Sequence, residues 1–235
     1  SHSLVMGELA VREDADEGIL YDMCFRFTIV LEKAECGWKI VHIHQSVADP
    51  NQASDEFFPH HMVEQTYTQI VYNLRHDSLT GLLNRLYFKE TCERFLTAGD
   101  SGAFLMIDID MFKNINDQYG HPAGDKTLIS FSESLKSVIA PNALAGRVGG
   151  DEFTLFLPGM NHKGEMEGFF TMLNTDWGER QKLLQMHEPV SISVGVTFTS
   201  KGNNSYGVLL NKADQALYLA KTNKNDGLVH WEFLL

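Results

Sequence analysis

The sequence predicts an α+β fold, in which helices surround a sheet, preceded by a small β-rich segment and a linker helix. Three observations predict it. In the first fifty residues, apolar positions alternate with polar ones, which is the period of a strand. After about residue 76, apolar runs alternate with segments of helical spacing, so helices should cover a sheet. No Gly-rich fingerprint follows the first of these runs, and residues 148–153 read as a hairpin, which argues against a simple doubly wound sheet.

Residues 1–55 form the predicted β-rich segment. The stretches 25–31 and 38–44 both alternate, and the turn signal Glu35-Cys36-Gly37 between them predicts a hairpin. Residues 4–11 are a weaker strand. Three strands without a helix bury too little surface to be stable alone. We therefore expect the end of a domain that begins upstream, or one that a partner chain completes.

Residues 56–75 are predicted to be a linker and signalling helix. The polar stretch from Pro50 to Pro59 separates the two regions. Apolar residues then recur at steps of 4, 3 and 4, as a heptad-like stripe: Val63, Tyr67, Ile70 and Leu74. The stripe suits a helix that packs on its own domain and equally one that dimerises and transmits a signal.

Residues 76–235 form the predicted second domain. Helical spacing covers 79–96, 126–139 and 209–221, and strand-like runs cover 103–109, 153–157 and 191–198. The chain's formal net charge of −12 argues against a protein that coats a nucleic-acid polymer, because such binding needs Lys and Arg. No apolar run approaches the roughly 20 residues of a membrane span. We expect a cytoplasmic protein without membrane contact in this segment.

Two pairs of acids mark a candidate metal site. Asp108 and Asp110 end an apolar strand, where α/β proteins place ligands. Asp151 and Glu152 follow Gly149-Gly150 at a hairpin tip. Carboxylate oxygens with phosphate are the ligands that Mg²⁺ prefers. Each pair taken alone is a weak signal, better explained by a strand end or a hairpin tip in solvent.

Further polar residues mark candidate contacts to a nucleotide. Asn116 and Asp125 could read the edge of a purine, since an aspartate accepts from N–H groups and an asparagine both donates and accepts. A turn followed by an Asp-capped helix explains the same residues. Lys221 could reach a phosphate or simply complement the end of its helix.

Taken together, these motifs resemble the GGDEF domain of the diguanylate cyclase family. Over about 155 residues the motifs occur in the same order and with the same residue types as in that family. Three runs carry the likeness: 77–85 (DSLTGLLNR), 149–153 (GGDEF) and 193–196 (SVGV). The resemblance implies a mainly antiparallel sheet surrounded by helices, similar to the palm of nucleotide polymerases and to nucleotide cyclases. It implies an enzyme that condenses two GTP into cyclic di-GMP, releases two pyrophosphates and acts as a homodimer in bacterial signalling.

The resemblance also implies roles for individual residues. Asp108, the Ile109 carbonyl, Asp151 and Glu152 would hold Mg²⁺, with Mn²⁺ as the alternative ion, and Glu152 could instead help deprotonate the 3′-hydroxyl. The catalytic set would be Asp151, Glu152 and Asp108. The substrate-binding set comprises guanine-reading, phosphate-contacting and backbone-approach positions: Asn116, Asp125, Phe112, Lys113, Gly149, Gly150, Lys221 and Lys224.

Two departures from the family pattern matter. Where members often carry an Arg on phosphate, this chain has Lys224 nearby, and Lys is not equivalent at a bidentate site. The inhibitory Arg-x-x-Asp product site is replaced by Ala140-Pro141-Asn142-Ala143. We therefore expect no feedback inhibition there.

The N-terminal strands resemble the end of a SnoaL-like cone-fold domain. The alternative functions are a degenerate domain that binds GTP or cyclic di-GMP, or only dimerises, to regulate a partner, and a purine cyclase with another product.

Overall fold

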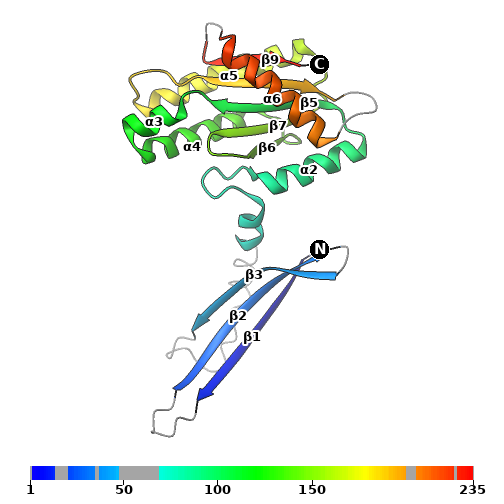
Figure 1. Cartoon of the computed structure of the whole chain (residues 1–235), viewed down its shortest axis with the longest axis vertical. Helices are drawn as coiled ribbons and strands as arrows, with labels where there is room; N and C mark the ends of the chain where they lie inside the picture. Colours follow the sequence, from blue (N-terminus) through cyan, green and yellow to red (C-terminus); the bar gives the residue numbers. More distant parts are fainter. Residues whose placement is uncertain are drawn as a thin grey trace. The chain divides into compact units, whose positions relative to one another are not determined.

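The computed structural model describes residues 2–13, 21–34, 37–47, 69–199, 205–224 and 227–234. The chain divides into two compact units, Ser1–Leu74 and Arg75–Leu235, and Figure 1 shows a sheet in each. The predicted linker at 50–59 lies outside the described residues, as does the first part of the predicted helix. Residues 69–75 are helical.

The first unit is a three-stranded antiparallel meander. It comprises β1 (His2–Glu13), β2 (Tyr21–Ala34) and β3 (Gly37–Val47), so all three predicted strands are present. Among its described side chains, Val30 is fully buried, whereas Trp38, Ile40 and Ile43 are exposed. These strands carry apolar side chains on a sheet that has almost no core within the described residues.

The second unit is built on a six-stranded sheet in the order β4-β6-β7-β5-β8-β9. The strands are β4 (Leu83–Asn84), β5 (Gly102–Ile109), β6 (Leu144–Arg147), β7 (Glu152–Pro158), β8 (Ile192–Phe198) and β9 (Val229–Phe233). The four central strands pair antiparallel, and the outer pairs β4–β6 and β8–β9 are parallel. The predicted fold class, a mainly antiparallel sheet surrounded by helices, is confirmed.

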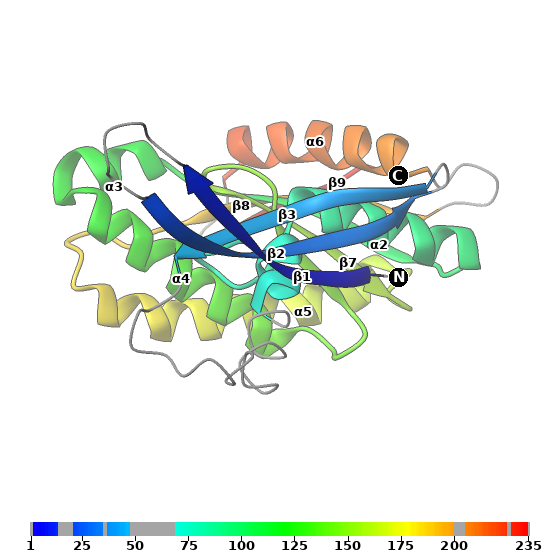
Figure 2. The ribbon, with the colours of Figure 1, turned by 90° about the horizontal axis from the view of Figure 1, so that it is seen from below.

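Helices cover both faces of this sheet. They are α2 (Arg85–Ala98), α3 (Phe112–Tyr119), α4 (His121–Val138), α5 (Lys163–Gln181) and α6 (Tyr206–Thr222). Figure 2 shows α6 and α5 on opposite sides of the sheet. A short 3-10 turn, Lys182–Leu184, follows α5. No helix in the described parts of the chain is long and apolar enough to cross a membrane.

Strand alternation divides the core into two clusters. Leu105 and Ile107 of β5 face α4 and α5, where Phe131 packs edge-on against Trp177 with ring centroids 5.3 Å apart. Phe104 and Met106 face α2 and α6. Because β5 is buried from end to end and lies between β7 and β8, its last residues are held firmly by both neighbours.

The predicted helix over 79–96 begins too early. Residues 78–82 form a turn, in which Gly81 has a φ of 69°, and α2 starts at Arg85. The Asn84 side chain caps α2 by accepting from the Tyr87 backbone N–H at 2.9 Å. A positive φ and an Asn cap are both signals that end or start a helix.

Candidate active site

Asp108 lies at the carboxyl end of β5, on the sheet face that α6 covers. The strand register places it opposite Glu152 of β7 and Ser193 of β8. Only 8% of Asp108 is exposed, and its Oδ2 is 2.8 Å from the Lys221 ammonium. Burial raises the pKa of Asp108 and outweighs the lowering effect of Lys221, and the charges of Asp151 and Asp110 raise it further. Asp108 is therefore a buried carboxylate with negative neighbours.

Asp110 is buried as well, but its oxygens are occupied by the fold. Ser191 Oγ and Ser193 Oγ donate to it at 2.6 and 2.8 Å, and Lys224 Nζ lies 3.1 Å away. Burial would raise the pKa of Asp110, but these hydrogen bonds outweigh it and hold the pKa below its usual value. Of the two aspartates in the predicted strand-end pair, Asp110 anchors β8 and only Asp108 remains for a ligand.

Asp151 is held beside the end of β5. The Ile109 backbone N–H donates to the Asp151 carbonyl at 3.3 Å, which ties the hairpin tip between β6 and β7 to the strand end. The charge of Asp151 is close enough to raise the pKa of Asp108. The structure thus brings together three members of the predicted metal set, two carboxylates and the Ile109 backbone.

Glu152, the fourth member, lies on the same sheet face as Asp108, but its carboxylate is directed toward Gly149. Its carboxylate packs against Gly149, so closely that a Cβ at Gly149 would collide with Glu152 Oε2. Glu152 also lines a cavity between α2 and α6 that includes none of the other predicted site residues. Gly149 is therefore required for the observed position of the Glu152 side chain.

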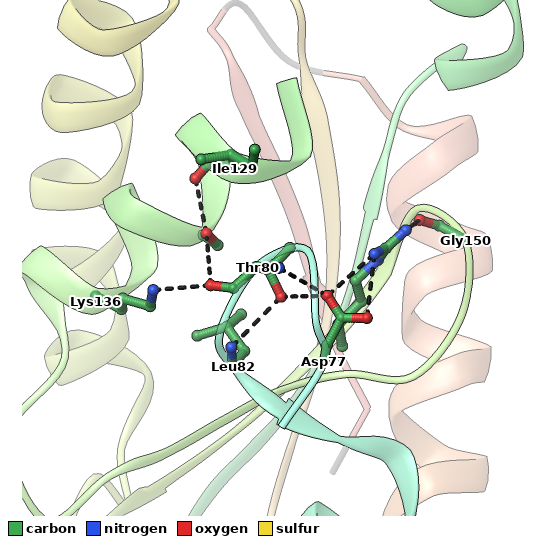
Figure 3. Close-up of polar contacts among 8 residues, drawn as sticks. Asp77, Thr80, Leu82, Ile129, Lys136 and Gly150 are labelled. Carbon is green, nitrogen blue, oxygen red and sulfur yellow. Dashed lines mark hydrogen bonds and ion pairs between the residues drawn. The ribbon is translucent and has the colours of Figure 1, made fainter. Parts of the chain in front are cut away.

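Arg147 joins the hairpin tip to the start of the second unit, and Figure 3 shows its two partners, Asp77 and Gly150. Its Nη2 and Nε donate to the Gly150 carbonyl at 2.7 and 3.1 Å, and its Nη1 donates to both Asp77 oxygens at 3.1 and 3.3 Å. The side chain and backbone N–H of Thr80 also donate to Asp77. Burial would raise the pKa of Asp77, but these contacts outweigh it and the pKa lies below 3.8.

The same turn is held on its other side by α4. Lys136 Nζ donates to the Thr80 carbonyl at 2.8 Å, as Figure 3 also shows. The turn that begins at Asp77 and includes Thr80 is thus fixed both to α4 and to the hairpin that carries Asp151. No role could be assigned to Arg147 or Asp77 from the sequence, because the two partners lie 70 residues apart along the chain.

The predicted guanine-reading residues lie at the corner between α3 and α4. Asn116 of α3 is half-buried, and its Oδ1 packs so closely on Gly124 that a Cβ there would collide with it. Asp125 follows Gly124 on α4 and is exposed. The corner therefore presents both side chains from neighbouring helices, with Asn116 fixed and Asp125 free to meet a ligand.

The predicted phosphate contacts surround the end of β5. Met111, with a left-handed φ of 54°, turns the chain from Ile109 into α3, whose first residues are Phe112 and Lys113. Lys221 and Lys224 come from the end of α6 and the residues after it, and each is 42% exposed at its side chain. In this structure the two lysines pair with Asp108 and Asp110.

The donor set fits a hard divalent cation. In the part of the chain that the structure describes, no three His, Cys, Asp or Glu side chains converge as a ready-made metal cluster. Asp108, Asp151 and the Ile109 carbonyl supply only oxygen, and the like charges around Asp108 favour a cation. Mg²⁺ is usually bound by one or two carboxylates together with substrate phosphates, and this set matches that arrangement.

Comparisons with known proteins identify the class. Residues 74–227 match the family described as diguanylate cyclase, GGDEF domain, and the chain therefore belongs to this family. Residues 4–50 match the SnoaL-like domain. Both predicted resemblances are confirmed.

Relatives of this chain include named diguanylate cyclases. DgcM of Escherichia coli K12 is 35% identical over 164 residues, which cover 68% of this chain and 38% of DgcM. The uncharacterized protein y4lL of Sinorhizobium fredii is 34% identical over 70% of this chain and 20% of its own length. The chain thus spans well under half the length of these relatives.

Solved structures agree with this assignment. The GGDEF domain of DgcB from Caulobacter crescentus, in complex with c-di-GMP, matches with a TM-score of 0.58 and 25% identity, covering 66% of this chain and 94% of that domain. Diguanylate cyclase SiaD of Pseudomonas aeruginosa, in complex with its activator SiaC, matches with a TM-score of 0.55 and 30% identity. The match covers 69% of this chain and 66% of SiaD.

Proposed function

We propose that this chain is an active, Mg²⁺-dependent diguanylate cyclase that works as a homodimer. The observation that supports this best is the junction of β5 with the hairpin tip, where Asp108, Asp151 and the Ile109 backbone meet. A degenerate domain would have no need of this oxygen set. When bound there, Mg²⁺ would offset charge on the triphosphate.

The chain's own residues would hold one GTP per subunit. Asn116 would donate to and accept from the guanine edge, and Asp125 would accept from guanine N1–H and N2–H₂, which selects guanine because adenine has no such donors. Lys113, Lys221 and Lys224 would bind the triphosphate, the last two leaving their present aspartate partners. Charged contacts of this kind position a phosphoryl group for in-line transfer.

The reaction would then run between two subunits. The 3′-hydroxyl oxygen of one GTP forms a bond to the α-phosphorus of the other, the bond from that phosphorus to pyrophosphate breaks, and a base takes the hydroxyl proton. Glu152 is the candidate for that base. The same exchange in the opposite direction closes the ring and releases the second pyrophosphate.

The turn at residues 140–143 supports an enzyme without product inhibition at that position. Ala143 N–H donates to the Ala140 carbonyl at 2.9 Å, and the turn carries no charged side chain. Without an Arg or an Asp there, a bound cyclic dinucleotide would have no charged partner. We expect cyclic di-GMP to leave the initial rate unchanged.

The test is incubation of the whole chain with GTP and Mg²⁺, followed by chromatography of the nucleotides. We expect cyclic di-GMP, at a rate that rises faster than linearly with protein concentration. Asp151→Ala should abolish it, whereas Asp100→Ala, which changes an exposed acid after α2, should not. A folded chain that binds GTP without turnover at high concentration would contradict the proposal and favour a regulatory domain.

A further inference from the structure

The cavity between α2 and α6 has a volume of about 350 Å³, and the hairpin residues Val148 and Glu152 form part of its wall. We call it the α2–α6 cavity. Because Glu152 stands opposite Asp108 in the β5–β7 register, the cavity adjoins the candidate metal site. A molecule that docks over this cavity would therefore lie next to the candidate active site.

Two opposite charges at this cavity have no partner in the fold. Arg85 at the start of α2 and Asp214 in the middle of α6 both line the cavity and are exposed. Neither side chain makes a hydrogen bond or an ion pair with another residue in the described parts of the chain. By contrast, Lys89 and Arg94, further along α2, contact Glu93 and Thr91 of their own helix. The fold thus leaves one unpaired positive group and one unpaired negative group around the same cavity.

Exposed apolar side chains accompany these two charges. Leu86, which follows Arg85, is 65% exposed, and Tyr218, one turn of α6 after Asp214, is 70% exposed. Interfaces between proteins combine aromatic and other apolar side chains with charged groups at their margin. The combination at α2 and α6 therefore indicates a surface that another protein covers.

We propose that the α2–α6 face, defined by Arg85, Leu86, Asp214 and Tyr218, docks a second copy of this chain. Arg85 would pair with the partner subunit's Asp214, and Asp214 with the partner subunit's Arg85. A two-fold interface uses the same patch on both subunits, so the patch must be complementary to itself. One positive and one negative group meet this requirement, whereas a small ligand would have to carry both charges.

This inference deepens the proposed function, because the reaction joins two GTP-loaded subunits. Docking over the α2–α6 cavity would bring the regions around Glu152 and Asp108 of both subunits to one interface. Each subunit would keep its own GTP, with the guanine at its own α3–α4 corner. The face would therefore position the subunits without contributing to the binding of either nucleotide.

Charge reversal at either position should weaken the dimer. Arg85→Glu would place a glutamate against Asp214 in both contacts, and Asp214→Arg would place an arginine against Arg85. We expect cyclic di-GMP production at low protein concentration to fall by about 100-fold in each variant, because like charges that face each other across an interface are strongly unfavourable. Binding of 3′-deoxy-GTP should be unchanged.

Lys182→Glu and Glu179→Arg are the matched controls. They make the same changes of charge in an exposed ion pair at the end of α5, on the opposite side of the sheet from α6 (Figure 2). Both controls should keep the wild-type rate. Arg85→Glu and Asp214→Arg variants that are as active as these controls would overturn the proposal, since the cavity would then serve another ligand.

Mixing the two variants is the sharpest test. A mixed dimer of Arg85→Glu and Asp214→Arg has two attractive contacts between subunits, although each chain keeps like charges around its own cavity. We expect an equimolar mixture to regain at least about half of the wild-type rate, because the two pairs are restored. If both variants are folded, as thermal unfolding would show, and their mixture stays inactive, the proposal is overturned.

A second readout does not depend on turnover. Chains with Arg85→Cys are mixed with isotopically labelled chains with Asp214→Cys, treated with a short bismaleimide and mapped by mass spectrometry. We expect a cross-link between positions 85 and 214 of different chains, and none when Lys182→Cys replaces Arg85→Cys. Absence of the 85–214 cross-link would overturn the proposal. The same cross-link in a chain that makes no cyclic di-GMP would support the docking face while contradicting the proposed function.

Discussion

Asp77→Asn tests whether the turn at the start of the second unit holds the hairpin tip that carries Asp151. Asp77 and Arg147 form an ion pair at 3.1 Å, with side chains 23% and 15% exposed. At an effective dielectric constant of about 20, the attraction at this distance is roughly 5 kcal/mol. Desolvation of both groups offsets much of it. The amide would keep an acceptor for Thr80, so we expect a net loss of about 2 kcal/mol in the free energy of unfolding.

The assay is thermal unfolding of the whole chain, with Glu179→Gln as the control. A loss of about 2 kcal/mol should lower the melting temperature of the second unit by roughly 4 to 8 °C, given its size. The control makes the same carboxylate-to-amide change in an exposed pair with Lys182, whose side chains are 70% and 66% exposed, and should cost at most about 0.5 kcal/mol. Equal melting temperatures for the two variants would refute the reasoning.

Three further measurements test the scaffold. The pKa of Asp77 is lowered on folding, so the carboxylate stabilises the fold above pH 3.8, and this stabilisation is lost as the pH falls through the pKa of the folded state. The difference in unfolding free energy between wild type and Asp77→Asn, followed by acid titration, should therefore shrink below about pH 4 and vanish at lower pH. Asp110→Asn should destabilise the chain by about 2 kcal/mol in a denaturant titration, because the buried Asp110 carboxylate accepts from two serines and an amide cannot accept from both in the same way. Gly195→Ala should lower stability by about 2 kcal/mol because its Cβ would collide with the α6 backbone, whereas Gly168→Ala should raise it by about 0.5 kcal/mol, and calorimetry would compare them.

Local patterns in the sequence were sufficient to predict most strands of both units. The apolar run that became β5 is buried along its whole length, as a central strand should be. Helix α5 was not predicted, although Met166, Phe169, Leu173 and Trp177 have the spacing of a buried helix face. Exposed apolar residues such as Met172 weaken the helical period over residues 163–181, so the sequence pattern alone does not single out this helix.

The roles of Asp110 and Arg147 could not be predicted in the same way. Asp110 accepts from Ser191 and Ser193, which lie 81 and 83 residues further along the chain. Arg147 pairs with Asp77, which lies 70 residues before it. Such contacts exist only once the sheet register is fixed, because the register decides which side chains share a face. The motif grouped Asp108 with Asp110, and only the fold separates a ligand-facing carboxylate from an internal anchor.

That separation changes how loss of function at the strand end should be interpreted. A mutational scan that records only cyclic di-GMP output would score Asp108 and Asp110 alike, as two essential acids two residues apart. The cellular level of the protein would distinguish the two kinds of variant. A chain without the Asp110 anchor should be degraded, whereas a chain without Asp108 should accumulate without activity. If the chain works as the proposed homodimer, variants of the second kind would remain folded and able to pair with normal subunits, and would therefore suppress the activity of the normal copies.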